Sequence, residues 1–320
     1  MPWLSLAPIL IWAAIFISVG AFFWLLYPSN KLTLLTLWLA YLLGNLYFFM
    51  AVNWALFDYY LRFAALALPF ALLLHWLRPL RNVPWLPTRT RSGISGLVVA
   101  LLLNILPAYL LVDIYRATNI NHVTTVPMLA LYPVRTGLYV IANGGNGQDG
   151  GVLNSYVTDW FGRSTNKDEE QAFAVDIMEL RTTGMVADGI LNKDFRTYEI
   201  FNEVVYSPCM GRVTGVMQGN PQVPPLSPAG GSGDRMGNRV IIQCNDTDFF
   251  VTLSNLRAVS VAVGESVSFN RIVGTVGNSA SDSVPSLHMF VTLSDGTPVP
   301  VLFEAGYNFK FVFRNYVYVR

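Results

Sequence analysis

The sequence predicts an α + β multidomain protein in which about four transmembrane helices precede an all-β domain. The chain of 320 residues is 53% hydrophobic and only 13% charged, whereas about a quarter of the residues in a soluble protein carry charge. The shortage of charge is confined to the first 113 residues, and ordinary globular composition begins near residue 117. We therefore expect a membrane domain at 1–116, a connector at 117–136 and an outer β domain at 137–320.

Four stretches are long and apolar enough to cross a bilayer, since a span needs roughly 20 such residues. They are Leu4–Tyr27, Leu32–Phe57, Tyr60–Leu77 and Gly93–Val112. The first lacks the positive region and the small-residue cleavage site of a signal peptide, and a second span follows at once. All four are apolar all round, whereas helices of a soluble bundle have a polar face. We interpret them as retained spans.

The positive charges in the short loops predict the orientation of the chain, because Lys and Arg gather in cytoplasmic loops. The loop between the third and fourth spans holds Arg78, Arg81, Arg89 and Arg91, and the loop between the first two holds Lys31. Both loops are therefore expected in the cytoplasm, and the second loop and the C-terminal domain outside it. Arg116, just past the fourth span, is the one residue that disagrees.

His75 lies near the cytoplasmic end of the third span, three residues before Arg78. An ionisable residue at membrane depth is a candidate for function. Two interpretations stay open: ordinary packing at the membrane interface, or a ligand for a haem-like or chlorophyll-like metal.

Short apolar runs alternate with turns from Gly137 onward, which predicts an all-β domain. The expected strands are Leu138–Ala142, Phe173–Met178, Val204–Tyr206, Arg212–Val216, Arg239–Gln243, Phe249–Leu253, Ala258–Val263, Arg271–Val276, His288–Leu293 and Phe309–Val319. Residues 218–237, rich in proline and glycine, are expected to form a long loop.

The order of segments in this part resembles the LytM or lysostaphin-type zinc peptidases, which cut peptide crosslinks in bacterial cell walls. The blocks that carry the resemblance are AFAVDI at 172–177, YSPCMGRV at 206–213, GNRVII at 237–242, FFVTLSNL at 249–256, VAVGESVSFNRIVGTVGNSAS at 261–281 and PSLHMF at 285–290. They occur in the family's order over roughly residues 137–303. The resemblance implies a LytM-like antiparallel sheet and a bacterial cell-envelope protein.

The residues that carry the family's chemistry are mostly missing. The resemblance implies a zinc held by the His and Asp of a His-x-x-x-Asp segment and by the last histidine of a His-x-His segment. Asp176 and His288 occupy two of these positions, but Ala172 stands at the first histidine position. The two histidines that assist the attacking water are replaced by Asn255 and Ser286, which cannot act as a base near neutral pH. An upstream Asn-x-His segment of some relatives reads Asn154-Ser155-Tyr156.

We therefore expect no catalytic residue, no zinc and no other cofactor, with Asp176 and His288 as residual ligand positions. Catalytic zinc takes about three protein ligands. The chain has only two further histidines, His75 and His122, of which His75 lies in the third span. An oxidising compartment permits a disulfide. The resemblance also implies that the strand beginning at Cys209 pairs with the strand ending at Cys244, so that these cysteines form one.

These expectations favour a non-catalytic LytM-like module anchored in a bacterial inner membrane, with its C-terminal domain on the periplasmic side. It would act as an accessory subunit or binding module that contacts the lipid bilayer, other membrane or envelope proteins, or peptidoglycan. One alternative is an active zinc metallopeptidase with a third ligand from Glu179, Asp159 or His122. Another is a transport or cofactor-bearing membrane protein with an outer cap. The near-zero net charge and the lack of a basic stripe give no sign of a nucleic-acid partner.

Overall fold

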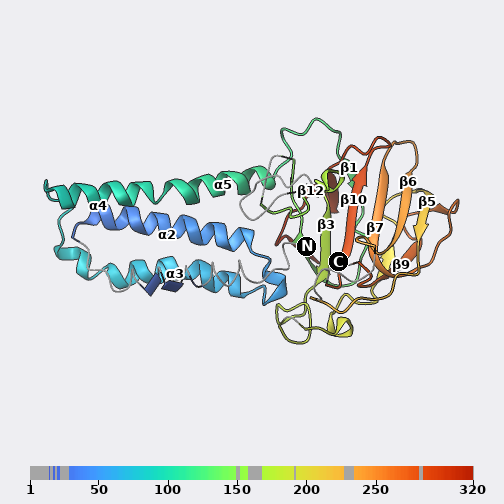
Figure 1. The fold of residues 1–320 in the computed structure, drawn as a ribbon, viewed down its shortest axis with the longest axis horizontal. Helices are drawn as coiled ribbons and strands as arrows, with labels where there is room; N and C mark the ends of the chain where they lie inside the picture. The colour runs from blue at the N-terminus through green and yellow to red at the C-terminus, as the bar shows by residue number, and fades with distance from the viewer. Residues whose placement is uncertain are drawn as a thin grey trace. The chain divides into compact units, whose positions relative to one another are not determined.

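The computed structural model describes residues 29–148, 152–157, 168–190, 192–226, 234–280 and 284–319, together with residues 14, 17, 18, 20 and 21. The chain divides into two compact units (Figure 1). The helical unit falls within Ser5–Val52 and Tyr60–Ile114, and the β unit contains Asn53–Tyr59 and Tyr115–Arg320.

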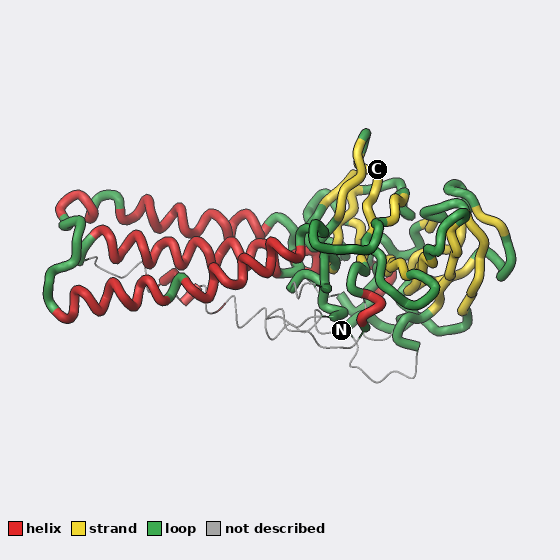
Figure 2. The backbone as a smooth tube through the Cα atoms, turned by 90° about the horizontal axis from the view of Figure 1, so that it is seen from above, coloured by secondary structure: helices red, strands yellow, loops and turns green. Residues whose placement is uncertain are grey.

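The helices are α2 (Lys31–Ala51), α3 (Leu61–Trp76), α4 (Arg91–Leu102) and α5 (Ile105–Ala117), seen in red in Figure 2. Within the described residues, two stretches are long and apolar enough to cross a membrane: Lys31–Ala51, and Arg91–Ala117 taken through α4 and α5. The third predicted span forms a helix of 16 residues, which is shorter than a full crossing requires. The first predicted span lies outside the described residues apart from a few positions. The expectation of about four spans is thus met in part.

The fourth predicted span is interrupted between α4 and α5. Pro107 has no N–H, so it cannot donate a helical hydrogen bond to the carbonyl of Leu103. Asn104 stands at the interruption, and its side-chain amide donates to the carbonyls of Ala100 (2.8 Å) and Thr36 (3.0 Å). The break is therefore tied to α2.

The start of α2 lies beside the arginine-rich segment 78–91. The backbone N–H groups of Lys31 and Leu32 donate to the carbonyls of Pro84 (2.8 Å) and Trp85 (3.0 Å). The Lys31 ammonium group also lies 4.9 Å from the centre of the Trp85 ring. The positive charges that predict the orientation are thus gathered at one end of the helical unit.

Two sheets make up the β unit. In the described residues, ten strands form the larger sheet, in the order β13-β2-β3-β10-β7-β6-β5-β8, with β4 and β9 joined to it through β7. Their bounds are β2 (Leu138–Asn143), β3 (Val175–Glu179), β4 (Val204–Tyr206), β5 (Gly211–Met217), β6 (Asn238–Cys244), β7 (Phe250–Val259), β8 (Ser266–Val267), β9 (Ile272–Val276), β10 (Leu287–Thr292) and β13 (Val317–Val319). The smaller sheet has the order β1-β11-β12, from Met128–Ala130, Val301–Ala305 and Asn308–Phe311.

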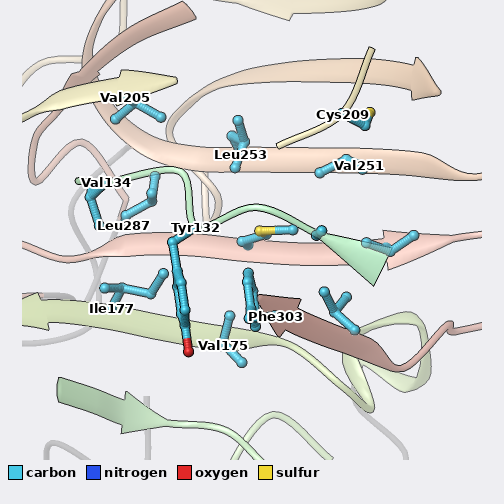
Figure 3. Close-up of a cluster of buried hydrophobic side chains, with 14 of the residues drawn as sticks. Tyr132, Val134, Val175, Ile177, Val205, Cys209, Val251, Leu253, Leu287 and Phe303 are labelled. Atoms are coloured by element: carbon cyan, nitrogen blue, oxygen red, sulfur yellow. The ribbon is translucent and has the colours of Figure 1, made fainter. Parts of the chain in front are cut away.

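The main core lies on one face of the larger sheet, where Leu253, Leu287 and Ile177 are fully buried (Figure 3). Tyr132 stacks between the rings of Phe303 (4.6 Å between centroids) and Tyr318 (3.6 Å). The segment expected as a connector therefore enters the core. The residues of this segment that are buried in the core are Met128, Ala130, Tyr132 and Val134.

The C-terminal tail is divided, although one strand was predicted over Phe309–Val319. β12 pairs with β11 in the smaller sheet, whereas β13 pairs with β2 in the larger one. Asn315 lies between them with a left-handed backbone (φ 67°), a conformation that asparagine tolerates better than most residues. The chain turns there from one sheet to the other. β11, at Val301–Ala305, was not predicted.

The loop between α2 and α3 belongs to the β unit, although the second span was predicted to continue to Phe57. Ala55 and Leu56 are buried (0% and 4% exposed) in a cluster with Val140 of β2 and Met178 of β3. The Tyr59 N–H donates to the Gly184 carbonyl (2.8 Å), and its hydroxyl donates to the Asn315 carbonyl (3.2 Å). If α2 and α3 enter a membrane, this loop and the β domain lie on the same side of it.

Candidate functional site

Strands β3 and β10 bring Asp176 and His288 together. The two residues are direct partners in the antiparallel register, so their side chains lie on the same face of the sheet. Nδ1 of His288 lies 2.8 Å from Oδ1 of Asp176, and both residues are buried (5% and 1% exposed). This face is opposite to the main core.

The Tyr156 hydroxyl completes this pair. It donates to the Asp176 carboxylate, at 3.0 Å from Oδ1 and 3.1 Å from Oδ2, and lies 3.0 Å from Nδ1 of His288. Asn154 holds the segment that carries Tyr156 in place. Its side-chain amide donates to the Ala172 carbonyl (2.8 Å), and its Oδ1 accepts from the Tyr156 N–H (3.1 Å). Three polar atoms therefore meet in a buried network that we call the Tyr–Asp–His cluster.

Burial raises the pKa of the Tyr156 hydroxyl well above its ordinary value of 10, and the neighbouring Asp176 carboxylate adds to the shift. The phenol therefore keeps its proton at physiological pH. A neutral phenol can donate a hydrogen bond to Asp176, but it is a poor ligand for a metal cation.

The cluster does not fit a zinc ion. Tetrahedral ligands at 2.0–2.1 Å from the metal lie about 3.3 Å from one another. The His288 nitrogen and the Asp176 oxygen are closer than this, at hydrogen-bond distance, and the Tyr156 oxygen occupies a third corner at 3.0 Å. The three groups are therefore hydrogen-bonded to one another at separations shorter than those between zinc ligands.

The other family positions have structural contacts. The Asn255 side chain donates to the Ser286 carbonyl (2.9 Å) and accepts from the Ala280 N–H (3.0 Å), with a left-handed backbone at φ 64°. The Ser286 hydroxyl donates to the Val284 carbonyl (3.1 Å). Ala172, Asn255 and Ser286 are each at most 3% exposed. Asn255 and Ser286, which stand at the positions expected to assist an attacking water, instead form hydrogen bonds with backbone groups of neighbouring loops.

The remaining candidate ligands do not join the cluster in the part of the chain that the structure describes. His75 lies in the last turn of α3 and His122 in the segment after α5, both exposed. Glu179 lies at the far end of β3, where it pairs with Tyr139 in the register. Asp159 lies outside the described residues. No group of three His, Cys, Asp or Glu side chains that could hold a metal occurs among the described residues.

Glu179 predicts a pH effect on stability. Burial raises its pKa from 4.5 to about 7, and the carboxylates of Glu203 and Glu199 add to the shift. Because the folded state binds this proton more tightly, the stability that it contributes is present below pH 4.5 and is lost as the pH rises through 7. We expect Glu179→Gln to stabilise the β unit at pH 8 by on the order of 1 kcal/mol after allowing for solvent screening. Thermal unfolding at pH 5 and pH 8 measures this.

Glu199→Gln is the matched control, because it removes a carboxylate that accepts from Arg181 at 2.9 Å. It should give no such gain at pH 8. A Glu179→Gln variant that is no more stable than the wild type at pH 8 would contradict the prediction.

The second prediction concerns the contribution of the Tyr156 hydroxyl to the stability of the β unit. Tyr156→Phe removes the donor to a buried carboxylate, which we expect to cost about 1–3 kcal/mol. Tyr198→Phe is the control: it removes a hydroxyl that donates to a neutral carbonyl, that of Asn192, at 2.9 Å. Chemical unfolding should show a larger loss in the free energy of unfolding for Tyr156→Phe than for Tyr198→Phe. Equal losses would show that the hydrogen bonds of the cluster stabilise the fold no more than an ordinary one.

A hollow of about 480 Å³ lies beside the cluster on the same face of the sheet. Phe290 lines the hollow, and its ring lies 5.5 Å from the His288 ring between centroids. The hollow also holds the charged side chains of Glu170, Arg239 and Asp295. The closed cluster is thus next to an open surface with apolar and charged groups.

Strands β5 and β6 place the two cysteines as a pair. Gly211 of β5 is opposite Cys244 of β6 in the register, and Cys209 comes two residues before it. The structure joins Cys209 and Cys244 in a disulfide with a Cα–Cα distance of 5.9 Å. The disulfide thus closes the hairpin that contains the long loop at 218–237.

Tyr156 is the site residue whose role the sequence did not reveal. The signal was present, because Tyr156 stands where the Asn-x-His segment of relatives has histidine. A tyrosine is longer than a histidine, and its hydroxyl can therefore reach the place between the two remaining ligand positions.

Comparison with known proteins gives structural similarity only. No protein-family model matches the chain, and no curated protein matches its sequence. Among solved structures, it is similar to the catalytic domain of the prophage-encoded protein EnpA from Enterococcus faecalis (15% identity, 39% of this chain and 71% of that chain, TM-score 0.26). It is also similar to the catalytic domain of lysostaphin from Staphylococcus simulans (20%, 31% and 66%, 0.24) and to a chain of the SpoIIIAH and SpoIIQ complex (18%, 41% and 67%, 0.27).

The matched structures include peptidase domains and a chain from a complex of two proteins. The chain spans between 66% and 71% of the length of these three matched chains. At these identities and TM-scores the similarity carries no statement about activity.

Proposed function

We propose that this protein is a non-catalytic, membrane-anchored module that serves as an accessory subunit of a larger membrane or cell-envelope complex. The observation that carries the proposal is the Tyr–Asp–His cluster. The Tyr156 hydroxyl stands between Asp176 and His288 at hydrogen-bond distance from both. A catalytic zinc site needs an open position for water, and here that space is filled by a buried phenol.

The contacts of the other family positions support the same proposal. Asn255 and Ser286 are buried and bonded to backbone groups of neighbouring loops. Such contacts keep the strands and loops in place without a general base. The sequence in this region therefore maintains the shape of the domain, and shape is what a binding module requires.

The helices support an anchor in the bilayer. Lys31–Ala51 and Arg91–Ala117 are long and apolar enough to cross it. We place the β domain on the extracytoplasmic side of a bacterial inner membrane for two reasons. The positive residues, which favour the cytoplasm, lie at the end of the helical unit where α2 begins, whereas the chain enters the β unit where α2 ends. The β unit also contains a disulfide, and disulfides persist in oxidising compartments. Its partners in this proposal are membrane or envelope proteins and the lipid bilayer, with peptidoglycan a further candidate at the hollow beside Phe290.

The test is a purification of the full chain from its native membrane in gentle detergent. Mass spectrometry identifies copurifying proteins, and elemental analysis of the same sample measures zinc. The proposal expects partners in fixed stoichiometry and far less than one zinc per chain. One zinc per chain that is lost in a His288→Ala variant would overturn the non-catalytic assignment and favour the metallopeptidase. A chain that purifies without any partner would overturn the accessory-subunit role.

A further inference from the structure

The hollow beside Phe290 has a floor made by three neighbouring strands of the larger sheet. Thr252 of β7 is the direct register partner of Phe290 on β10 and of Ile241 on β6, so these side chains form a row across the strands. Phe290 and Thr252 are buried (5% and 6% exposed). In the next row Phe250 of β7 pairs with Thr292 of β10, and both line the hollow. The floor is therefore largely apolar and about 10 Å wide, because neighbouring strands lie about 4.8 Å apart.

One edge of the hollow is acidic. It consists of the turn after β10, which carries Asp295, and of two carboxylates that lie against this turn. A Cβ atom at Gly296 would lie 3.2 Å from Oε1 of Glu170, so the Glu170 carboxylate is close to the turn. Oδ2 of Asp248 accepts from the Ser294 hydroxyl of the same turn (2.7 Å). Three carboxylates therefore gather at this acidic edge, and those of Glu170 and Asp295 belong to residues that line the hollow.

The acidic edge has no basic partner within the part of the chain that the structure describes. Arg239 is the one basic residue among those that line the hollow, and its guanidinium group pairs with the Asp234 carboxylate. Neither Glu170 nor Asp295 forms an ion pair with a described lysine or arginine. The hollow thus combines an apolar floor with negative charge that the described residues do not neutralise.

We propose that the hollow binds a lysine or arginine side chain carried by an extended segment of a partner protein. Such a side chain packs its aliphatic stem on apolar surface and keeps its charged end among polar groups, which matches the floor and the acidic edge. A cation beside the rings of Phe250 and Phe290 is also attracted by their faces. An extended segment of about three residues spans the floor. This assignment depends on the accessory role in the proposed function and names the chemistry of the partner.

The acidic edge favours a basic protein segment over a peptidoglycan peptide. Peptidoglycan peptides carry carboxylates of their own, and like charges brought together at an interface are unfavourable. The volume of about 480 Å³ exceeds what one side chain needs and leaves room for the backbone on either side of it.

The first experiment measures peptide binding to the full chain in detergent. Phe250 is replaced by 4-fluorophenylalanine, so that its fluorine resonance reports on the hollow. The probe is the capped peptide acetyl-Ala-Ser-Lys-Ser-Ala-amide, whose only charge is on the lysine side chain. In the control peptide norleucine replaces lysine, which keeps the aliphatic stem and removes the charge. We expect the lysine peptide to shift the resonance to saturation and to bind about tenfold more tightly than the control, because it alone forms charge-assisted hydrogen bonds.

Two double variants separate the acidic edge from the net charge of the chain. Glu170→Gln with Asp295→Asn should lower the affinity for the lysine peptide to that for the norleucine peptide. Asp188→Asn with Glu199→Gln removes the same charge from two carboxylates that pair with Arg181 outside the hollow, and should leave the affinity unchanged. Equal affinity for the two peptides, or equal binding by the two variants, would overturn the proposal. Tighter binding of a peptidoglycan stem peptide would also overturn it and would assign the hollow to the cell wall.

The same variants are then purified from the native membrane. We expect the partners of the wild-type chain to be retained by Asp188→Asn with Glu199→Gln and to be severalfold depleted from Glu170→Gln with Asp295→Asn. Partners retained equally by both variants would overturn only the assignment of the hollow, because the accessory role would stand. A wild-type chain without any partner would overturn the accessory role itself.

Discussion

Leu56→Asp is expected to destabilise the β unit by about 3 kcal/mol or more, although residue 56 lies in a short loop between two apolar helices. Leu56 is 4% exposed and packs in a cluster with Val140 and Met178. An unpaired charge buried among apolar side chains is among the most costly single changes in a protein. Hydrogen exchange of the full chain in detergent measures the effect, and β2 and β3 should lose protection first.

Leu56→Met provides the control, because it nearly conserves volume and adds no charge, so its cost should stay below about 1.5 kcal/mol. If the aspartate variant leaves the exchange of β2 and β3 unchanged, then the loop is not part of the domain core. If both variants lose protection equally, the loss does not come from charge burial.

Removal of the disulfide has the second large expected effect. Cys209 and Cys244 are separated by 35 residues in sequence, and a crosslink over such a loop restricts the unfolded chain by roughly 4 kcal/mol in the chain-entropy description. We therefore expect the double variant Cys209→Ala with Cys244→Ala to unfold at clearly lower denaturant concentration. Alanine is suitable because both cysteines are buried, at 6% and 5% exposure, and serine would bury hydroxyl groups.

The wild-type chain treated with a reductant is the internal control. Its unfolding midpoint should fall to that of the double variant, while the reductant should not affect the double variant. A double variant with the wild-type midpoint would show that the disulfide does not stabilise the domain.

The sequence predicted several strands of the β domain with close bounds, but Phe249–Leu253 and Ala258–Val263, expected as two strands, form the single strand β7, which ends at Val259. Val204–Tyr206 is a strand with the predicted bounds, and β2, β6 and β9 differ by one or two residues at their ends. It failed for β1 and β11, which are short and derive their stability from pairing with each other across about 170 residues. Contacts between such distant segments leave no local pattern in the sequence.

Two residues that the sequence singled out, Asp176 and His288, lie together in the structure, but the geometry around them did not follow from the sequence. The resemblance implied that Asp176 and His288 occupy two ligand positions of the family, and the structure places Oδ1 and Nδ1 of these residues 2.8 Å apart. The position of the Tyr156 hydroxyl depends on the amide of Asn154 and the turn at Ala172. These contacts are made between loops that are distant in sequence. Comparison of the sequence with the family pattern therefore shows only that position 156 lacks a histidine.

The loop between α2 and α3 also sets the order in which the protein can be completed. Tyr59 donates to a carbonyl 256 residues later, that of Asn315, and Leu56 packs in a cluster that includes Val317. At about 5–20 residues per second, synthesis of the intervening chain takes roughly 13–50 s. During that time Ala55 and Leu56 lack their final neighbours. The loop between α2 and α3 is therefore buried only when the last strand has emerged, so a chain truncated near its C-terminus would leave Ala55 and Leu56 without part of their cluster.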